Sequence, residues 1–145
     1  MNTSSPGNEN FSGRKCAGVR TQQRISRFPI FIACRGLSDN KKFQVYTSPT
    51  CLAIAFYFAE KKSGSVLAKQ KIEILVSKID ITPTDKETVL QAIRNKSIED
   101  FEDGLEYYAA AQSKCHVIVT EDTKGFYFSE LEVLSAEDFM VKYVM

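Results

Sequence analysis

Four carboxylates stand close together where Asp100-Phe101-Glu102-Asp103-Gly104-Leu105-Glu106 opens a predicted helix. Another carboxylate, Asp122, follows the short apolar and β-branched run Val117-Ile118-Val119. Because strand ends and helix starts meet at the carboxyl edge of an open α/β sheet, we expect these acids to converge there. Oxygen ligands with few basic neighbours suit a divalent metal ion. The pattern therefore points to metal-assisted chemistry on phosphodiester bonds.

Each of these acids also has a structural interpretation. Asp100 is well placed as a helix N-cap that accepts a hydrogen bond from a backbone N–H near Asp103. Glu102 and Asp103 would both interact favourably with the positive end of the helix dipole. Glu106 lies one turn further on, where it could instead belong to a solvated helix face, and Asp122 could be an ordinary turn residue. The residue types alone leave both interpretations open.

Composition and motifs exclude several other classes of protein. The chain has 145 residues, 43% hydrophobic and 26% charged, which fits one globular domain, and no apolar run reaches the roughly 18 residues that span a membrane. There is no phosphate-binding glycine loop and no nucleophile elbow, and His116 stands alone at a predicted strand start, so we read it as structural. The four cysteines show no C-x-x-C spacing and are interpreted as reduced thiols of a cytoplasmic protein: Cys16, Cys34, Cys51 and Cys115.

The net charge of +1 hides a division along the chain. Residues 1–42 carry eight basic and two acidic residues, net +6, whereas residues 43–145 carry 11 basic and 16 acidic residues, net −5. Residues 1–27 are polar and aperiodic, and we predict that they are disordered or aberrant. A frameshift or a misplaced start upstream of Phe43 would explain the different composition of residues 1–42 as a whole. Residues 28–145 are predicted to form the folded domain, with a clear pattern from residue 43 onward.

Hydrophobic periodicity and capping signals predict the order of the elements. We expect short strands at 28–34, 43–47, 116–120 and 132–134, and a brief extended piece at 81–83. The expected helices run from 48 or 49 to about 62, with an apolar and largely buried circumference, from 66 to 79 after a break at 63–65, and from 100 to 113. Capping boxes at Thr84–Glu87 and Ser135–Asp138 predict two further helices. Short strands separated by helices predict a mostly parallel sheet with helices on both faces, an α/β fold.

Three segments resemble a known family. They are the run from Asp100 to Ala110, the run Val117-Ile-Val-Thr-Glu-Asp122-Thr-Lys-Gly125-Phe126, and the closing segment from Val133 to Phe139. In order and spacing, these segments resemble a PIN domain, the three-layer fold of VapC-type toxin nucleases. The resemblance extends from about Phe43 to Val144. It implies a ribonuclease that depends on Mg²⁺ or Mn²⁺, an antitoxin protein as partner, and a homodimer.

The resemblance also assigns roles to particular residues. It implies metal ligation or catalysis by Asp103 and Asp122, with Asp100 and Glu106 as further candidate metal ligands. The family's first strand ends in Asp-Thr-Asn, which this sequence lacks. A second acid of the family usually lies on the helix after the strand that contains Phe43, but this chain has no acid between Thr50 and Ala59. Gly125 stands where the last acid of the family is expected.

Two functional hypotheses follow from this incomplete set. One is a relic or binding module that keeps the PIN fold with weak activity or none. The alternative is an active Mg²⁺- or Mn²⁺-dependent ribonuclease. Aromatic residues between Tyr107 and Phe128 could stack on RNA bases, but at this spacing core or dimer-face packing is the simpler interpretation.

Overall fold

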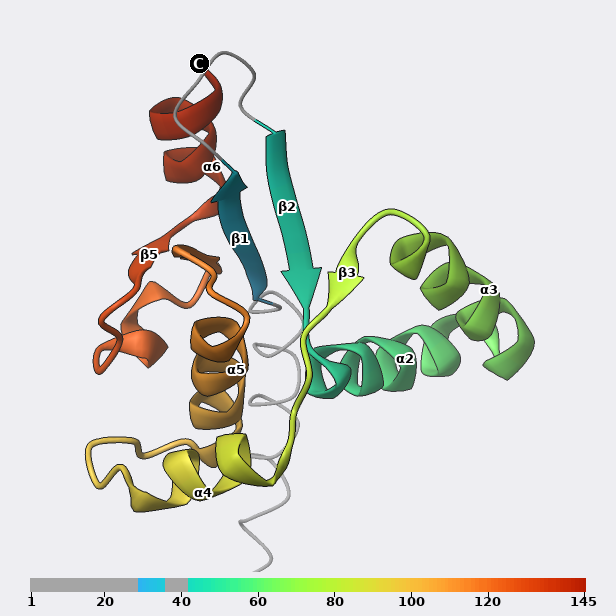
Figure 1. Cartoon of the computed structure of the whole chain (residues 1–145). Coiled ribbons are helices and arrows are strands. Elements are labelled where there is room, and N and C mark those ends of the chain that lie inside the picture. Colours follow the sequence, from blue (N-terminus) through green and yellow to red (C-terminus); the bar gives the residue numbers. More distant parts are fainter. Residues whose placement is uncertain (1–28, 36–41) are drawn as a thin grey trace, which may run out of the picture.

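The computed structural model of the chain describes residues 29–35 and 42–145. A five-stranded sheet forms the centre of this part of the molecule (Figure 1). The strand order is β3-β2-β1-β4-β5. The strands are β1 (Ile30–Arg35), β2 (Lys42–Thr47), β3 (Asp80–Ile81), β4 (Val117–Val119) and β5 (Glu132–Leu134). The strands predicted from the sequence are therefore present, whereas the prediction for residues 1–27 lies outside the described residues.

The direction of β1 distinguishes it from the other strands. β2 pairs in parallel with β3, and β4 pairs in parallel with β5, but β1 is antiparallel to both β2 and β4. Four strands thus share one direction, as the prediction of a mostly parallel sheet requires, and β1 opposes them in the middle of a mixed sheet. The connection from β1 to β2 spans only residues 36–41. That length suits an antiparallel pair, because a parallel crossover needs a dozen residues or more.

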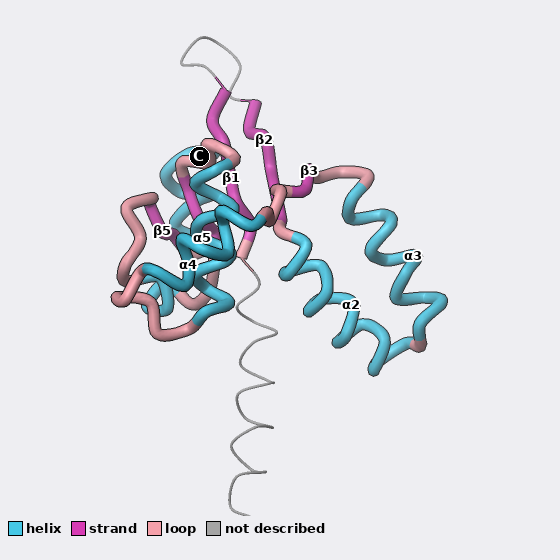
Figure 2. The backbone as a smooth tube through the Cα atoms, turned by 60° about the horizontal axis from the view of Figure 1, so that its bottom comes forward, coloured by secondary structure: helices cyan, strands magenta, loops and turns pink. Residues whose placement is uncertain are grey.

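Helices cover both faces of this sheet, which confirms the three-layer α/β prediction (Figures 1 and 2). They are α2 (Pro49–Ser63), α3 (Ser65–Val76), α4 (Lys86–Arg94), α5 (Phe101–Gln112) and α6 (Ala136–Phe139), with the short helices η1 (Thr123–Phe126) and η2 (Met140–Val144). Phe31 and Ile32 are neighbours on β1 and point to opposite faces. Phe31 packs with Tyr107 of α5, whereas Ile32 belongs to a second cluster with Phe139 of α6.

The hairpin formed by α2 and α3 extends away from the sheet (Figures 1 and 2). Its turn is at Gly64, whose φ of 79° lies in the left-handed region that glycine tolerates, so the predicted break at 63–65 is confirmed. The prediction that α2 is largely buried was wrong. Cys51 is its one buried residue, and the predicted apolar positions are half-buried. The apolar residues around a helix are buried on all sides only if neighbours surround it, and α2 contacts α3 and, near its start, α5.

The start of α4 differs from the predicted capping box by one residue. Asp85, not Thr84, is the N-cap, and its Oδ1 accepts a hydrogen bond from the backbone N–H of Thr88 at 2.9 Å. The other carboxylate oxygen accepts from the Gln112 side-chain amide at 2.9 Å, which is the main reason that the pKa of Asp85 is lowered. The cap therefore joins the start of α4 to the end of α5. The Thr84 hydroxyl is buried and makes no hydrogen bond.

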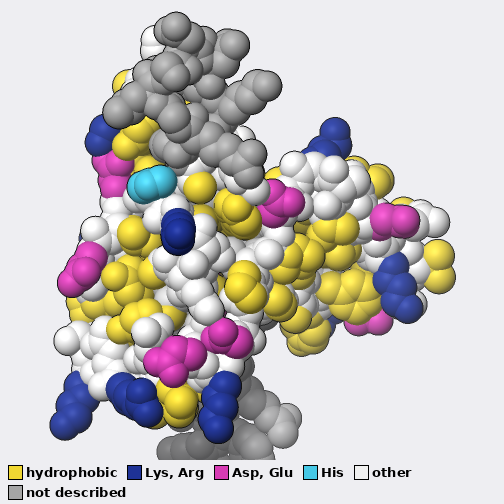
Figure 3. Space-filling model, viewed as in Figure 1, with side chains coloured by type: hydrophobic (Ala, Val, Ile, Leu, Met, Phe, Trp, Pro, Cys, Tyr) yellow, Lys and Arg dark blue, Asp and Glu magenta, His cyan; other side chains and the backbone are white. Residues whose placement is uncertain are grey.

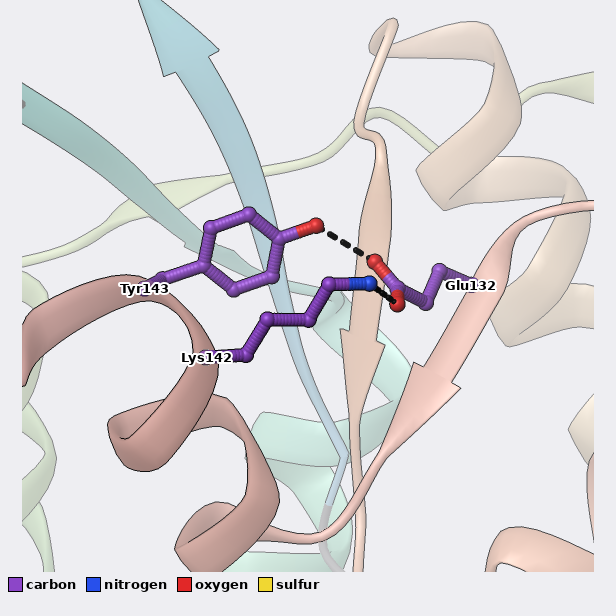
Figure 4. A network of polar contacts seen from close by, with 3 residues as sticks. All are labelled: Glu132, Lys142 and Tyr143. Carbon is purple, nitrogen blue, oxygen red and sulfur yellow. Dashed lines mark hydrogen bonds and ion pairs between the residues drawn. The ribbon is translucent and has the colours of Figure 1, made fainter.

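The C-terminal helix is held to β5 by a polar cluster (Figure 4). Ser135 caps α6 by accepting from the backbone N–H of Asp138 at 3.1 Å, as predicted. Glu132 accepts hydrogen bonds from the Lys142 ammonium and the Tyr143 hydroxyl, and the Lys142 contact is the largest cause of the lowered pKa of Glu132. Beneath this cluster, the Phe139 and Tyr143 rings pack beside Phe43 of β2.

Candidate functional site

Asp103 and Asp122 approach one another at Gly125. Asp103 lies in the first turn of α5, and Asp122 follows β4 and precedes η1. A Cβ atom placed on Gly125 would lie 2.6 Å from Asp122 Oδ2 and 3.2 Å from Asp103 Oδ2. The two carboxylates therefore face the same point, where the glycine leaves room that a side chain would fill.

Asp122 also shapes the backbone at this point. Its Oδ1 accepts a hydrogen bond from the Gly125 backbone N–H at 3.3 Å, so it caps η1. Its own N–H donates to the Thr120 hydroxyl at 3.1 Å. The turn interpretation of Asp122 is thus satisfied geometrically, and its second oxygen still faces Asp103. Any side chain at position 125 would displace the Asp122 carboxylate, because a 2.6 Å contact is below the van der Waals limit.

Asp100 is the N-cap of α5. Its Oδ1 accepts from the backbone N–H of Glu102 at 3.0 Å, which confirms the cap interpretation and identifies the N–H. Asp100 is exposed, while Glu102 and Asp103 in the following turn are half-buried. The start of α5 thus has three acids within four residues, at the end of the helix where their charges interact favourably with the dipole.

Glu106 is buried, so its interpretation as part of a solvated helix face was wrong. Its side chain is 3% exposed, and its Oε1 accepts a hydrogen bond from the Cys51 thiol of α2 at 3.1 Å. Burial is the largest cause of a rise in the pKa of Glu106 to about 8, which the thiol hydrogen bond opposes and the charges of Asp103, Glu102 and Asp100 increase. Burial also raises the pKa of the Cys51 thiol. The site therefore contains a largely neutral carboxyl at pH 7.

The partner of Glu106 was not found from the sequence. Cys51 lies 55 residues earlier, and no local pattern joins the two positions. Small residues on α5 allow the approach of other elements. Ala109 and Ala110 are fully buried, and a Cβ atom placed on Gly104 would lie 3.1 Å from the Ile98 side chain and 3.3 Å from that of Ala92. Such a run of small residues is the one sequence signal for the tightly packed side of α5.

Comparison with known proteins identifies the family. A family model described as a PIN domain matches residues 21–124. Ribonuclease VapC1 of Aquifex aeolicus (strain VF5) is 31% identical over 131 residues, which cover 88% of this chain and 89% of the relative. The chain belongs to the PIN domain family. It is related to a VapC ribonuclease, and no helix in the described parts of the chain is long and apolar enough to cross a membrane.

In this PIN domain, β1 brings no acid to the edge at which Asp122 lies. The sequence of β1 is IFIACR, and its first residue, Ile30, pairs with Val119 at the end of β4. Because β1 is antiparallel to β4, its last residue, Arg35, lies at the opposite end of the strands from Asp122. Within residues 29–35 and 42–145, no group of three or more His, Cys, Asp or Glu side chains is arranged to hold a metal ion.

The aromatic residues near the PIN-domain site mainly form its core. Tyr107 and Phe126 are buried, and Phe128 packs edge-on against Tyr107 with ring centroids 5.4 Å apart. Tyr127 is exposed, and its hydroxyl donates to the backbone carbonyl of Ser97. The packing interpretation therefore accounts for Tyr107, Phe126 and Phe128, and Tyr127 is the exposed ring of the set.

Proposed function

We propose that this chain is a PIN-domain protein, related to VapC-type toxin ribonucleases, whose metal site is incomplete and whose RNA cleavage is weak or absent. The observation that supports the proposal is that the Asp103 and Asp122 carboxylates converge on Gly125, which has no side chain to act as a third ligand. A nuclease site needs several oxygen ligands at this point, because each carboxylate helps to hold the ion against its hydration shell.

The residues of the described part do not fit a catalytic divalent ion. Asp103 and Asp122 are the two candidate ligands that face one another. Glu106 is close in sequence, but its carboxyl accepts the Cys51 thiol hydrogen bond, and its pKa of about 8 means that it must lose a proton before it could serve as an anionic ligand. Asp100 caps α5 from an exposed position. Two carboxylates give too little charge and too few ligands for firm Mg²⁺ binding.

One observation favours the alternative of an active enzyme. The two carboxylates that converge belong to different elements, α5 and the segment after β4, as expected for a ligand site at the edge of an α/β sheet. The relative is named a ribonuclease. In this alternative, Mg²⁺ or Mn²⁺ would supply activated water for the cleavage of RNA phosphodiester bonds. RNA, an antitoxin protein and a homodimer partner remain parts of the proposal in both cases.

Titration with Mn²⁺ tests the metal site directly. We expect isothermal titration calorimetry of the purified chain to give weak binding, and Asp103→Asn to reduce whatever binding there is, because it removes one of two facing carboxylates. Asp80→Asn is the matched control, since Asp80 is exposed on β3 at the far edge of the sheet. Tight binding of one Mn²⁺ per chain, lost in Asp103→Asn and kept in Asp80→Asn, would favour the active enzyme.

A further inference from the structure

Tyr127 carries an exposed aromatic ring next to the candidate site. It follows η1 directly and lies two residues after Gly125, on which the Asp103 and Asp122 carboxylates converge. Tyr127 is 59% exposed, whereas the aromatic residue before it is buried and the one after it is half-buried. Core packing therefore accounts for its two neighbours and leaves more than half of Tyr127 in contact with solvent.

Two contacts hold the Tyr127 ring in place. Its hydroxyl donates a hydrogen bond to the backbone carbonyl of Ser97, in the loop between α4 and α5. The Phe128 ring lies perpendicular to it, with the ring centroids 5.5 Å apart, and this contact covers at most one face of Tyr127. A ring that is already fixed at its polar end loses little conformational freedom when a ligand binds. Tyr127 is therefore a preorganised aromatic surface.

Basic side chains lie on both chain segments that the Tyr127 hydrogen bond joins. Lys124 belongs to η1, Lys96 directly precedes Ser97, and Arg94 ends α4, and all three are exposed. Figure 3 shows Lys and Arg side chains along the lower edge of the molecule, over α4 and the loop that follows it, with acidic side chains just above them. Tyr127 is therefore flanked by these basic segments as well as by the carboxylates of the candidate site.

A single strand of RNA matches this combination of an exposed ring and basic side chains. An unpaired base stacks on an aromatic ring, while the phosphates of the strand contact lysines. A stacked base carries no charge, so it can approach the acids of the site without the repulsion that a phosphate meets there. Duplex RNA does not match, because its bases are already paired and stacked, and proteins contact it through its backbone.

We propose that Tyr127 is a stacking surface for an unpaired RNA base, and that Lys96 and Lys124 contact phosphates of the same strand. The proposal rests on RNA as the ligand in the proposed function, and it specifies that the RNA is single-stranded. Binding of this kind needs neither a metal ion nor cleavage. It is therefore independent of whether Asp103 and Asp122 form a complete metal site.

A tryptophan at position 127 tests the stacking directly. The chain contains no Trp, so Tyr127→Trp introduces a single indole whose fluorescence a stacked base quenches. We expect its emission to fall when the variant is titrated with a mixed-sequence, single-stranded RNA of about ten nucleotides, in low salt and with EDTA to prevent cleavage. Tyr57→Trp is the matched control, because Tyr57 is 48% exposed on α2, and its emission should stay constant.

Fluorescence anisotropy with the same RNA, labelled at one end, measures the affinity. We expect Tyr127→Ala to weaken binding about tenfold, the usual effect of removing one stacking ring, and Tyr127→Phe to keep most of the affinity because it keeps the ring. Equal losses in both variants would assign the effect to the Ser97 hydrogen bond and overturn the proposal.

Three further results would overturn the proposal: no binding of single-stranded RNA by the unmodified chain, constant emission from Tyr127→Trp, or tighter binding of a duplex of the same sequence. The emission test also covers the case in which Tyr127→Ala fails to fold. Metal-dependent cleavage of RNA, measured separately, would contradict the proposed function and leave these binding results unchanged, so the two failures can be distinguished.

Discussion

Phe31→Ala is expected to lower the free energy of unfolding by about 3–5 kcal/mol, the cost of removing a large side chain from a packed core. Phe31 is fully buried near the start of β1, the central strand of the sheet, and belongs to the cluster that contains Cys51, Tyr107 and Ile118. The surrounding elements come from three distant parts of the chain and cannot all close on the cavity. The loss should therefore lie in the upper part of the range for a core substitution.

Urea denaturation followed by circular dichroism measures this effect. Phe101→Ala is the matched control, because Phe101 is 48% exposed at the start of α5 and should cost far less. The comparison decides whether the segment before Phe43 belongs to the fold. If Phe31→Ala costs no more than Phe101→Ala, β1 is not the central strand, and the chain completes its sheet in another way.

The second large effect is the pH dependence that Glu106 gives to stability. The pKa of Glu106 is raised from 4.5 to about 8, mainly by burial, so the folded state binds a proton that the unfolded state releases between these values. Stability from this group is complete below pH 4.5 and falls as the pH rises to about 8, by up to ~1.4 kcal/mol per pH unit. Asp85 and Glu132 act in the opposite sense at acid pH, because their pKa values are lowered.

Glu106→Gln separates these contributions. The amide has the shape of the neutral carboxyl, and its oxygen can accept the Cys51 thiol hydrogen bond without titrating. We expect the free energy of unfolding of the variant to stay nearly constant from pH 5 to 8, while that of the unmodified chain falls. Glu73→Gln, at an exposed position of α3, should retain the fall. Parallel pH profiles for Glu106→Gln and the unmodified chain would mean that Glu106 is ionised in the fold.

Local patterns were sufficient to predict most elements from Phe43 onward. The β-branched run at 117–119, the cap at Ser135 and the glycine at 64 each act within a few residues, so the sequence reveals them directly. The proximity of Asp103 and Asp122 was also expected, because a strand end and a helix start share one edge of the sheet. Their role as metal ligands stays a prediction.

Features that depend on distant neighbours could not be predicted in the same way. The reversed direction of β1 depends on its partners and on the short connection at 36–41. The burial of Glu106 depends on Cys51, which approaches it from another helix. The half-exposure of α2 follows from the absence of a helix on its outer side within the described residues. In each case, the side-chain types were compatible with more than one environment, and tertiary packing selected one of them.

The proposal that the metal site is incomplete is tested most directly by incubating a mixed RNA pool with the purified chain. Cleavage is compared in the presence of Mg²⁺ or Mn²⁺ and in the presence of EDTA. We expect no metal-dependent cleavage above the EDTA background, because Asp103 and Asp122 converge at a glycine and β1 has no acid at the same end of the sheet. Asp103→Asn should behave identically. Metal-dependent cleavage by the unmodified chain that disappears in Asp103→Asn would contradict the proposal of an incomplete metal site and establish an active ribonuclease.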